Sequence, residues 1–187
     1  KAANYNTTAI GSEAQAIANY AQAMGYQSKA SGLASNAIGW NAGATAHDAT
    51  AIGSGAKATA QNATAIGSGA KADGKDAVVL GTDSFVQDDD SIAIGKGATV
   101  KSDTLGISQN SIAFGTNAKV KGGNSTAIGW LADTGDGAGM LAVGDGASTN
   151  NKTAGSATFN QDNNQSVALG SRAKAFGDQA IAIGGEV

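Results

Sequence analysis

The chain has no cysteine, no proline and a single histidine among its 187 residues. Without cysteine there are no disulfides and no thiolate metal sites, and one histidine leaves few ways to build a nucleophilic or metal-dependent centre. Aromatic residues make up 5% of the chain and charged residues 14%. The formal net charge of −3 offers no overall basic field to nucleic acid or anionic lipid. These absences disfavour catalysis and nucleic-acid binding, and no apolar run reaches the length of a membrane helix.

The chain does contain a short phrase, small–x–Ala–aliphatic–Gly, that recurs along its whole length. The glycines that close the phrase are Gly11, Gly25, Gly39, Gly53, Gly67, Gly81, Gly95, Gly115, Gly129, Gly144, Gly170 and Gly184. The first seven follow one another at intervals of 14 residues. Later intervals of 20, 15 and 26 residues indicate insertions into an otherwise regular repeat, the two long ones near residues 101–108 and 150–164.

Each repeat alternates small and larger residues with a period of two, which is typical of β-strands. Before the glycine a small residue stands two positions away and a large apolar residue one position away, as in Ala51 and Ile52. A second alternating stretch follows the glycine, as in Ala56 and Ala58. Each 14-residue unit therefore predicts two short strands and two turns, which make one coil of a solenoid. We expect residues 1–187 to form one domain of about 12 such coils.

The alternation also predicts which side chains face outward. Small residues of both strands face each other in a thin interior, so the large residue before each glycine lies on the outer face of the first strand. Coils stacked about 4.8 Å apart align these residues into a stripe that monomers rarely leave in water. We predict a self-association interface formed by Ile10, Met24, Ile38, Ile52, Ile66, Leu80, Ile94, Phe114, Ile128, Val143, Leu169 and Ile183. The pattern leaves open the number of subunits and the hand of the coil.

Phrases such as Ser91-Ile-Ala-Ile-Gly95, Asn124-Ser-Thr-Ala-Ile-Gly129 and Gln165-Ser-Val-Ala-Leu-Gly170 resemble the head repeat of YadA-like trimeric autotransporter adhesins, over nearly the whole chain. The resemblance implies an all-β fold, a left-handed parallel β-roll assembled as a homotrimer. It also implies a place on the surface of a Gram-negative bacterium, with the signal peptide, the stalk and the C-terminal outer-membrane anchor outside these residues. The implied partners are host matrix proteins such as collagen, fibronectin or laminin, or a host cell receptor.

Residues with reactive or metal-binding side chains are few, and we expect no catalytic, cofactor or metal site. His47 stands in a predicted turn and is expected to be solvated. The acidic run Asp88, Asp89 and Asp90, and the separate Asp133, Asp136 and Asp145, could attract a cation, but solvated turn residues are the favoured interpretation. Glycine-rich phrases such as Gly53-Ser-Gly55 lack a following helix and are interpreted as turns.

Two further groups of residues are predicted to lie on the surface. Tyr26, Trp40 and Trp130 each follow a repeat glycine and should occupy equivalent bends, either as binding anchors or as cover for a neighbouring coil or subunit. The lysines of the second stretch and its bends are expected on the outer flank: Lys57, Lys71, Lys96, Lys101, Lys119, Lys121 and Lys174. The insertions at 101–108 and 150–164 are candidates for recognition loops.

Four other functions are compatible with parts of the pattern. Self-association between bacteria or a spacer role are alternatives to host binding. A left-handed β-helix acyltransferase is disfavoured because its subrepeat is six residues and His47 has no evident catalytic partner. An ice-binding solenoid is suggested by Thr8, Thr50, Thr64 and Thr126 at one repeat position, but other coils carry Ile, Val, Leu, Gln or Asn there.

Overall fold

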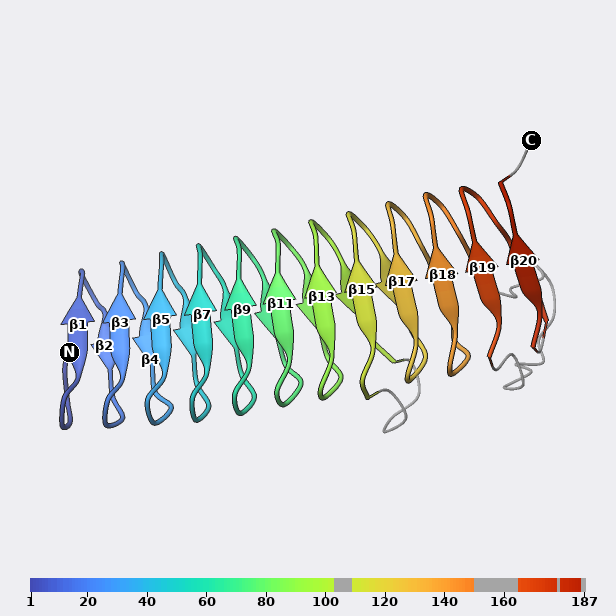
Figure 1. Cartoon of the computed structure of the whole chain (residues 1–187). Coiled ribbons are helices and arrows are strands. Elements are labelled where there is room, and N and C mark those ends of the chain that lie inside the picture. Colours follow the sequence, from blue (N-terminus) through green and yellow to red (C-terminus); the bar gives the residue numbers. More distant parts are fainter. Residues whose placement is uncertain (103–108, 150–164, 178, 186–187) are drawn as a thin grey trace, which may run out of the picture.

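Each copy of the repeat forms one coil of a parallel β-solenoid in the computed structural model (Figure 1), which describes residues 1–102, 109–149, 165–177 and 179–185. The three residues before each repeat glycine form a strand, and these strands make up a 12-stranded sheet. They are β1 (Thr8–Ile10), β3 (Gln22–Met24), β5 (Asn36–Ile38), β7 (Thr50–Ile52), β9 (Thr64–Ile66), β11 (Val78–Leu80), β13 (Ile92–Ile94), β15 (Ile112–Phe114), β17 (Thr126–Ile128), β18 (Leu141–Val143), β19 (Val167–Leu169) and β20 (Ile181–Ile183).

The stretch after each glycine forms a second sheet of eight two-residue strands. They are β2 (Gln15–Ala16), β4 (Lys29–Ala30), β6 (Gly43–Ala44), β8 (Lys57–Ala58), β10 (Lys71–Ala72), β12 (Phe85–Val86), β14 (Thr99–Val100) and β16 (Lys119–Val120). Beyond β16 the same column continues as single bridges, which join Lys119 to Asp133, Asp133 to Ser148, and Ser148 to Lys174. The predicted all-β parallel solenoid is confirmed, and the described residues contain no helix that could cross a membrane.

Insertions leave the register of the 12-stranded sheet unchanged. Ile52 pairs with Ile66, the equivalent residue 14 positions later. The same column runs across the longer intervals, since Ile94 pairs with Phe114 and Val143 pairs with Leu169. A slip of one residue would turn the apolar side chains inward, so this register is tightly specified. Most of the two predicted insertions, residues 103–108 and 150–164, lies outside the described residues.

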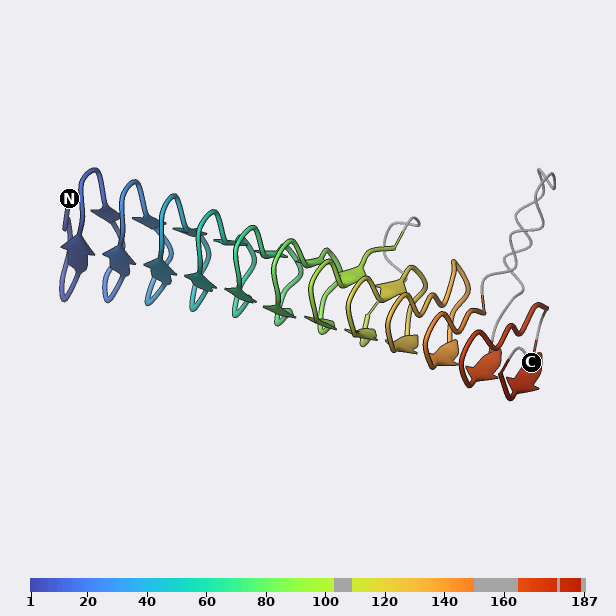
Figure 2. The ribbon, with the colours of Figure 1, turned by 90° about the horizontal axis from the view of Figure 1, so that it is seen from above.

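The interior between the two sheets is thin (Figure 2). It is filled mainly by alanines that are fully buried, such as Ala51, Ala56, Ala58 and Ala65. The fully buried serines supply hydrogen bonds along the stack: Ser111 N–H donates to Ser91 Oγ at 3.1 Å, and Ser125 N–H donates to Ser111 Oγ at 3.3 Å. Because buried polar groups are satisfied in this way, serine can replace alanine in the core without a large penalty.

The repeat glycine is required by backbone conformation and by close packing. Gly53 has a φ of +131°, and an added Cβ would lie 2.5 Å from the carbonyl oxygen of Gly67 in the next coil. Side chains are excluded at this position by both constraints. Two other positions of the repeat adopt a left-handed conformation. One is at the bend before the first strand, where Asn62 has a φ of +58°, and the other is at the bend after it, where Asn117 has a φ of +56°. Asparagine, aspartate and glycine tolerate this region best.

Candidate functional surfaces

The outer face of the 12-stranded sheet carries the predicted apolar stripe. All twelve predicted interface residues are the last residue of a strand, and none of them is buried. Ile10, Phe114 and Ile183 have exposed fractions of 57%, 51% and 77%. The residue two positions earlier in the strand lies on the same face and is often apolar, as in Val78, Ile112 and Ile181. The contact of this face with another subunit stays a prediction.

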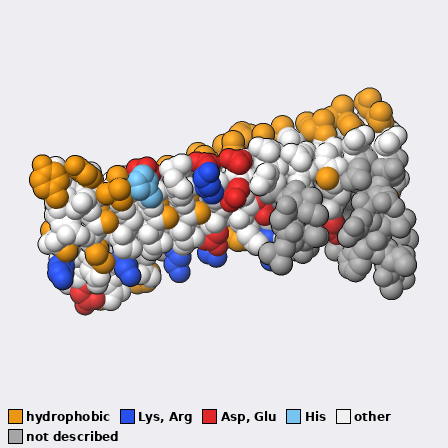
Figure 3. Space-filling view, turned by 90° about the horizontal axis from the view of Figure 1, so that it is seen from below, with side chains coloured by type: hydrophobic (Ala, Val, Ile, Leu, Met, Phe, Trp, Pro, Cys, Tyr) orange, Lys and Arg blue, Asp and Glu red, His pale blue; other side chains and the backbone are white. Residues whose placement is uncertain are grey.

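The opposite face of the roll, formed by the eight-stranded sheet, is basic rather than apolar. Lysine side chains line one long edge of the molecule in Figure 3, and hydrophobic side chains line the other edge toward the C-terminal coils. Lys57 and Lys71 are paired neighbours on β8 and β10, and both are exposed. Lys71 Nζ lies 2.5 Å from Asp73 Oδ2 and 5.0 Å from the centre of the Phe85 ring. These placements agree with the prediction that the lysines occupy the outer flank.

Aromatic residues gather at the bends. Tyr26, Trp40 and Trp130 follow their repeat glycines at equivalent bends, as predicted, and the two tryptophans have exposed fractions of 56% and 55%. The sequence did not indicate one further aromatic contact. The rings of Tyr5 and Tyr20 meet edge to face with centroids 5.7 Å apart, at the bends before β1 and β3. Exposed aromatics on a rigid scaffold are typical contact residues.

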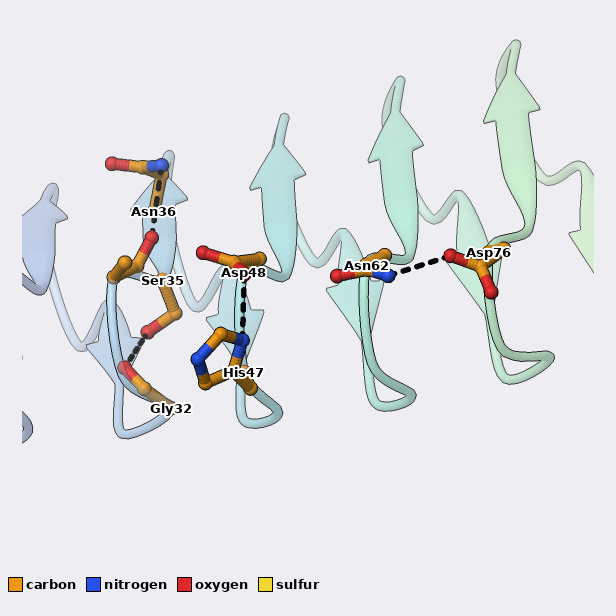
Figure 4. Close-up of polar contacts among 8 residues, drawn as sticks. Gly32, Ser35, Asn36, His47, Asp48, Asn62 and Asp76 are labelled. Atoms are coloured by element: carbon orange, nitrogen blue, oxygen red, sulfur yellow. Dashed lines mark hydrogen bonds and ion pairs between the residues drawn. The ribbon is translucent and has the colours of Figure 1, made fainter.

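His47 has a closer partner than its sequence context suggested. Its Nδ1 lies 2.6 Å from Oδ2 of Asp48, and both side chains are about half exposed, at 49% and 48% (Figure 4). The two residues are neighbours in one turn of the chain. A contact between two half-exposed side chains at the surface contributes little to stability.

The carboxylates of the bends are held by hydrogen bonds from adjacent coils. Asn62 Nδ2 donates to Asp76 Oδ1 at 2.6 Å, and this bond lowers the pKa of Asp76 below its ordinary value of 3.8, aided by Lys75. Asp89 Oδ1 accepts from the Lys75 N–H at 2.7 Å, and Asp88 Oδ2 accepts from the Ser102 N–H at 3.0 Å. In the ranges described, no group of three or more His, Asp or Glu side chains is placed to hold a metal ion.

The geometry defines a class of protein. The chain is a repetitive β-solenoid with two long, flat and chemically different faces, which suits binding along a surface better than chemistry in a pocket.

Comparison with known proteins agrees with this class. The family model described as YadA head domain repeat (2 copies) matches residues 23–42, 44–70, 72–98, 107–132 and 163–186, which is more than half of the chain. The crystal structure of the collagen-binding domain of the Yersinia adhesin YadA is similar, with a TM-score of 0.62 and 26% identity over 98% of this chain and 83% of that one. No curated protein sequence matches. The chain belongs to the YadA head family and is an adhesin head domain with a β-roll fold.

Proposed function

We propose that the chain is the head of a homotrimeric adhesin that attaches a Gram-negative bacterium to host extracellular matrix, and that collagen is the first ligand to test. The observation that carries the assembly is the exposed apolar column of the 12-stranded sheet, which runs from Ile10 to Ile183 without a break in register. The observation that favours collagen is the similarity to a domain described as collagen-binding. The family also supports a place on the bacterial surface.

Burial of the apolar column favours association strongly. Covering one exposed Ile, Leu or Phe side chain contributes roughly 1.5–3 kcal/mol. The column has five exposed and seven partly exposed side chains per chain. Together they contribute on the order of 10–20 kcal/mol, against the roughly 4–15 kcal/mol lost in bringing subunits together. A trimer closes the interface around one axis and leaves the eight-stranded sheet of each chain on the outside.

Repetition gives the assembled head its binding mode. Equivalent side chains recur about 4.8 Å apart along each chain. A fibrous ligand that repeats along its own axis can therefore meet many weak sites at once, and linked weak sites bind far more tightly than any one of them. Trp40, Trp130 and the Tyr5–Tyr20 pair are exposed aromatic contacts available to such a ligand.

The test is binding of the purified chain to immobilised collagens, fibronectin, laminin and host cells, with its mass checked by light scattering. We expect a mass of about 54 kDa, three times the 18.1 kDa chain, and saturable binding to at least one matrix protein. A confirmed trimer that binds none of them would overturn host attachment and favour association between bacteria or a spacer role. A monomer at all concentrations would overturn the assembly.

A further inference from the structure

A groove crosses the outer face of the eight-stranded sheet over β4, β6 and β8. Its volume is about 350 Å³, and its lining includes Gln15, Lys29, Asn41, Gly43, Thr45 and Lys57. These residues come from adjacent coils that stack in register, with Gly43 paired to Lys29 on one side and to Lys57 on the other. The groove therefore belongs to the repeat scaffold rather than to a loop.

Gly43 creates the groove, because it leaves a gap in a column that otherwise carries side chains. It does not have the positive φ of the repeat glycines, and an added Cβ would meet no atom within 4 Å. Neither the backbone nor the packing of the coil requires glycine here. Glycine inside a strand weakens it, and often marks a place where a ligand approaches the backbone closely.

Two lysines flank this gap. Lys29 and Lys57 lie two strands apart, about 10 Å by the usual strand spacing, and both are exposed on this face. In the described part of the chain, the lysine ion pairs involve Lys71, Lys75 and Lys121 but not Lys29 or Lys57. The acidic residue that lines the groove, Glu13, accepts a hydrogen bond from Gln27 Nε2 at 2.8 Å.

The positive charge of the groove continues along the same face, although the chain as a whole is acidic. Most aspartates occupy the bends, as Asp48, Asp76 and Asp90 do, whereas the outer face of the second sheet and its edge are rich in lysine. These lysines are Lys29, Lys57, Lys71, Lys101, Lys119, Lys121 and Lys174. Asp73 pairs with Lys71 on this face, Asp136 lies near Lys121, and Asp133 stands between Lys119 and Lys174 in the same column. Lysines still outnumber carboxylates here, so a net charge of −3 conceals a basic track along one face.

We propose that this groove binds a charged sugar unit of a sulfated polysaccharide, with the polymer extending along the basic track. Lys29 and Lys57 would bind sulfate groups, and the amide and hydroxyl groups of Gln15, Asn41 and Thr45 would hydrogen-bond the sugar. The described lining contains no aromatic ring, so stacking of neutral sugars or nucleic-acid bases is disfavoured. Because the apolar face lies on the other sheet, the site does not depend on trimer formation or on binding of matrix proteins.

The test is titration of the whole 187-residue chain with size-defined heparin oligosaccharides by calorimetry, at several salt concentrations. Hyaluronan, which carries carboxylates but no sulfate, and neutral dextran serve as ligand controls. The variants are Lys29→Gln with Lys57→Gln, which removes the two charges, and Gly43→Gln, which fills the gap and keeps them. The charge-matched control is Lys75→Gln with Lys96→Gln, because both of these lysines lie at bends.

We expect salt-sensitive binding of heparin by the native chain and a loss of affinity of about tenfold or more in the double Lys29 and Lys57 variant. Gly43→Gln should lower the affinity by a similar factor, while the Lys75 and Lys96 control stays within about twofold. Equal loss in the control variant, an unaffected Gly43→Gln variant, equal binding of hyaluronan, or no heparin binding at low salt would each overturn the proposal. Collagen binding, assayed separately, reports on the proposed function alone.

Discussion

Asn62 and Asp76 occupy the same bend position in neighbouring coils, and the Nδ2 of Asn62 donates a hydrogen bond to Oδ1 of Asp76 at 2.6 Å. Both residues are in the left-handed conformation, with φ values of +58° and +55°. Thr59 Oγ1 makes a parallel contact, donating to Asp73 Oδ1 at 2.7 Å. Side chains at the bends therefore link successive coils outside the backbone ladder, and they do so because the register repeats.

The hydrogen bond from Asn62 predicts the titration of Asp76. The Asn62→Gly variant keeps the left-handed backbone and removes the donor, so the pKa of Asp76 should rise toward 3.8. Because the folded pKa lies below the unfolded one, the contact stabilises the coil above about pH 4 and is lost as the pH falls through the folded value. Carboxyl chemical shifts followed against pH by NMR measure this. Asn124→Gly, the same change in a distant coil, should leave the pKa of Asp76 unchanged, and an unchanged pKa in both variants would contradict the assignment.

A pair of glycine substitutions separates required from optional glycines. Gly53→Ala places a Cβ 2.5 Å from Gly67 O at a φ of +131°, so it should lower the free energy of unfolding by on the order of 3 kcal/mol. Gly43→Ala should be neutral or slightly stabilising, because an added Cβ there meets nothing within 4 Å. Urea unfolding of both variants at one protein concentration measures the difference. Equal destabilisation by the two would show that the repeat glycine has no special role.

The repeat made most of the fold predictable. Phrases closed by glycine predict the strands of the 12-stranded sheet, and the alternation of Ala51 with Ile52 predicts which side chains face inward. Skipping the inserted residues brings Ile94 beside Phe114, as the sheet has them. The prediction succeeded because a period of two combined with a period of 14 leaves one register that buries the small residues.

Contacts made at the bends were harder to predict. Tyr5 stands six residues before Gly11, whereas Tyr20 stands five residues before Gly25, so the two do not share a repeat position. Their rings nevertheless meet at neighbouring bends, where Tyr20 itself has a φ of +60°. The groove at Gly43 escaped notice for a related reason: in a sequence with 28 glycines, one that is not required by the backbone looks like the others.

Ala34 offers a stabilising substitution. It has a φ of +54° at a bend position where most other coils carry Asn or Asp. Left-handed backbone costs an L-residue about 1–2 kcal/mol, and glycine avoids this cost. Glycine in turn loses about 0.5–1 kcal/mol more conformational entropy than alanine on folding, which offsets part of the gain. Ala34→Gly should therefore raise the free energy of unfolding by about 0.5–1 kcal/mol. Ala60→Gly, at the bend position where Gly32 and Gly74 stand and where the φ is not positive, should lower it, and thermal or urea unfolding that gave both variants the same sign would refute the argument.

Charge placed on the apolar face should open the proposed trimer. Ile52 and Ile66 are paired neighbours on β7 and β9, and their side chains point outward from the 12-stranded sheet. Replacing both with Asp in three chains puts six carboxylates around the interface, where each must be desolvated next to charges of the same sign. Light scattering should show the mass fall from about 54 kDa toward the 18.1 kDa of a single chain.

The control introduces the same two carboxylates on the other sheet, with a larger change in net charge. Lys57→Asp with Lys71→Asp should keep the trimer, because both side chains lie on the outer face of β8 and β10. Circular dichroism tells dissociation from unfolding, since a separated chain that keeps its coils retains its β-sheet signal. If the Ile52 and Ile66 variant stays trimeric while the Lys57 and Lys71 variant dissociates, the subunits meet through the eight-stranded sheet, and the basic track would then be the buried face.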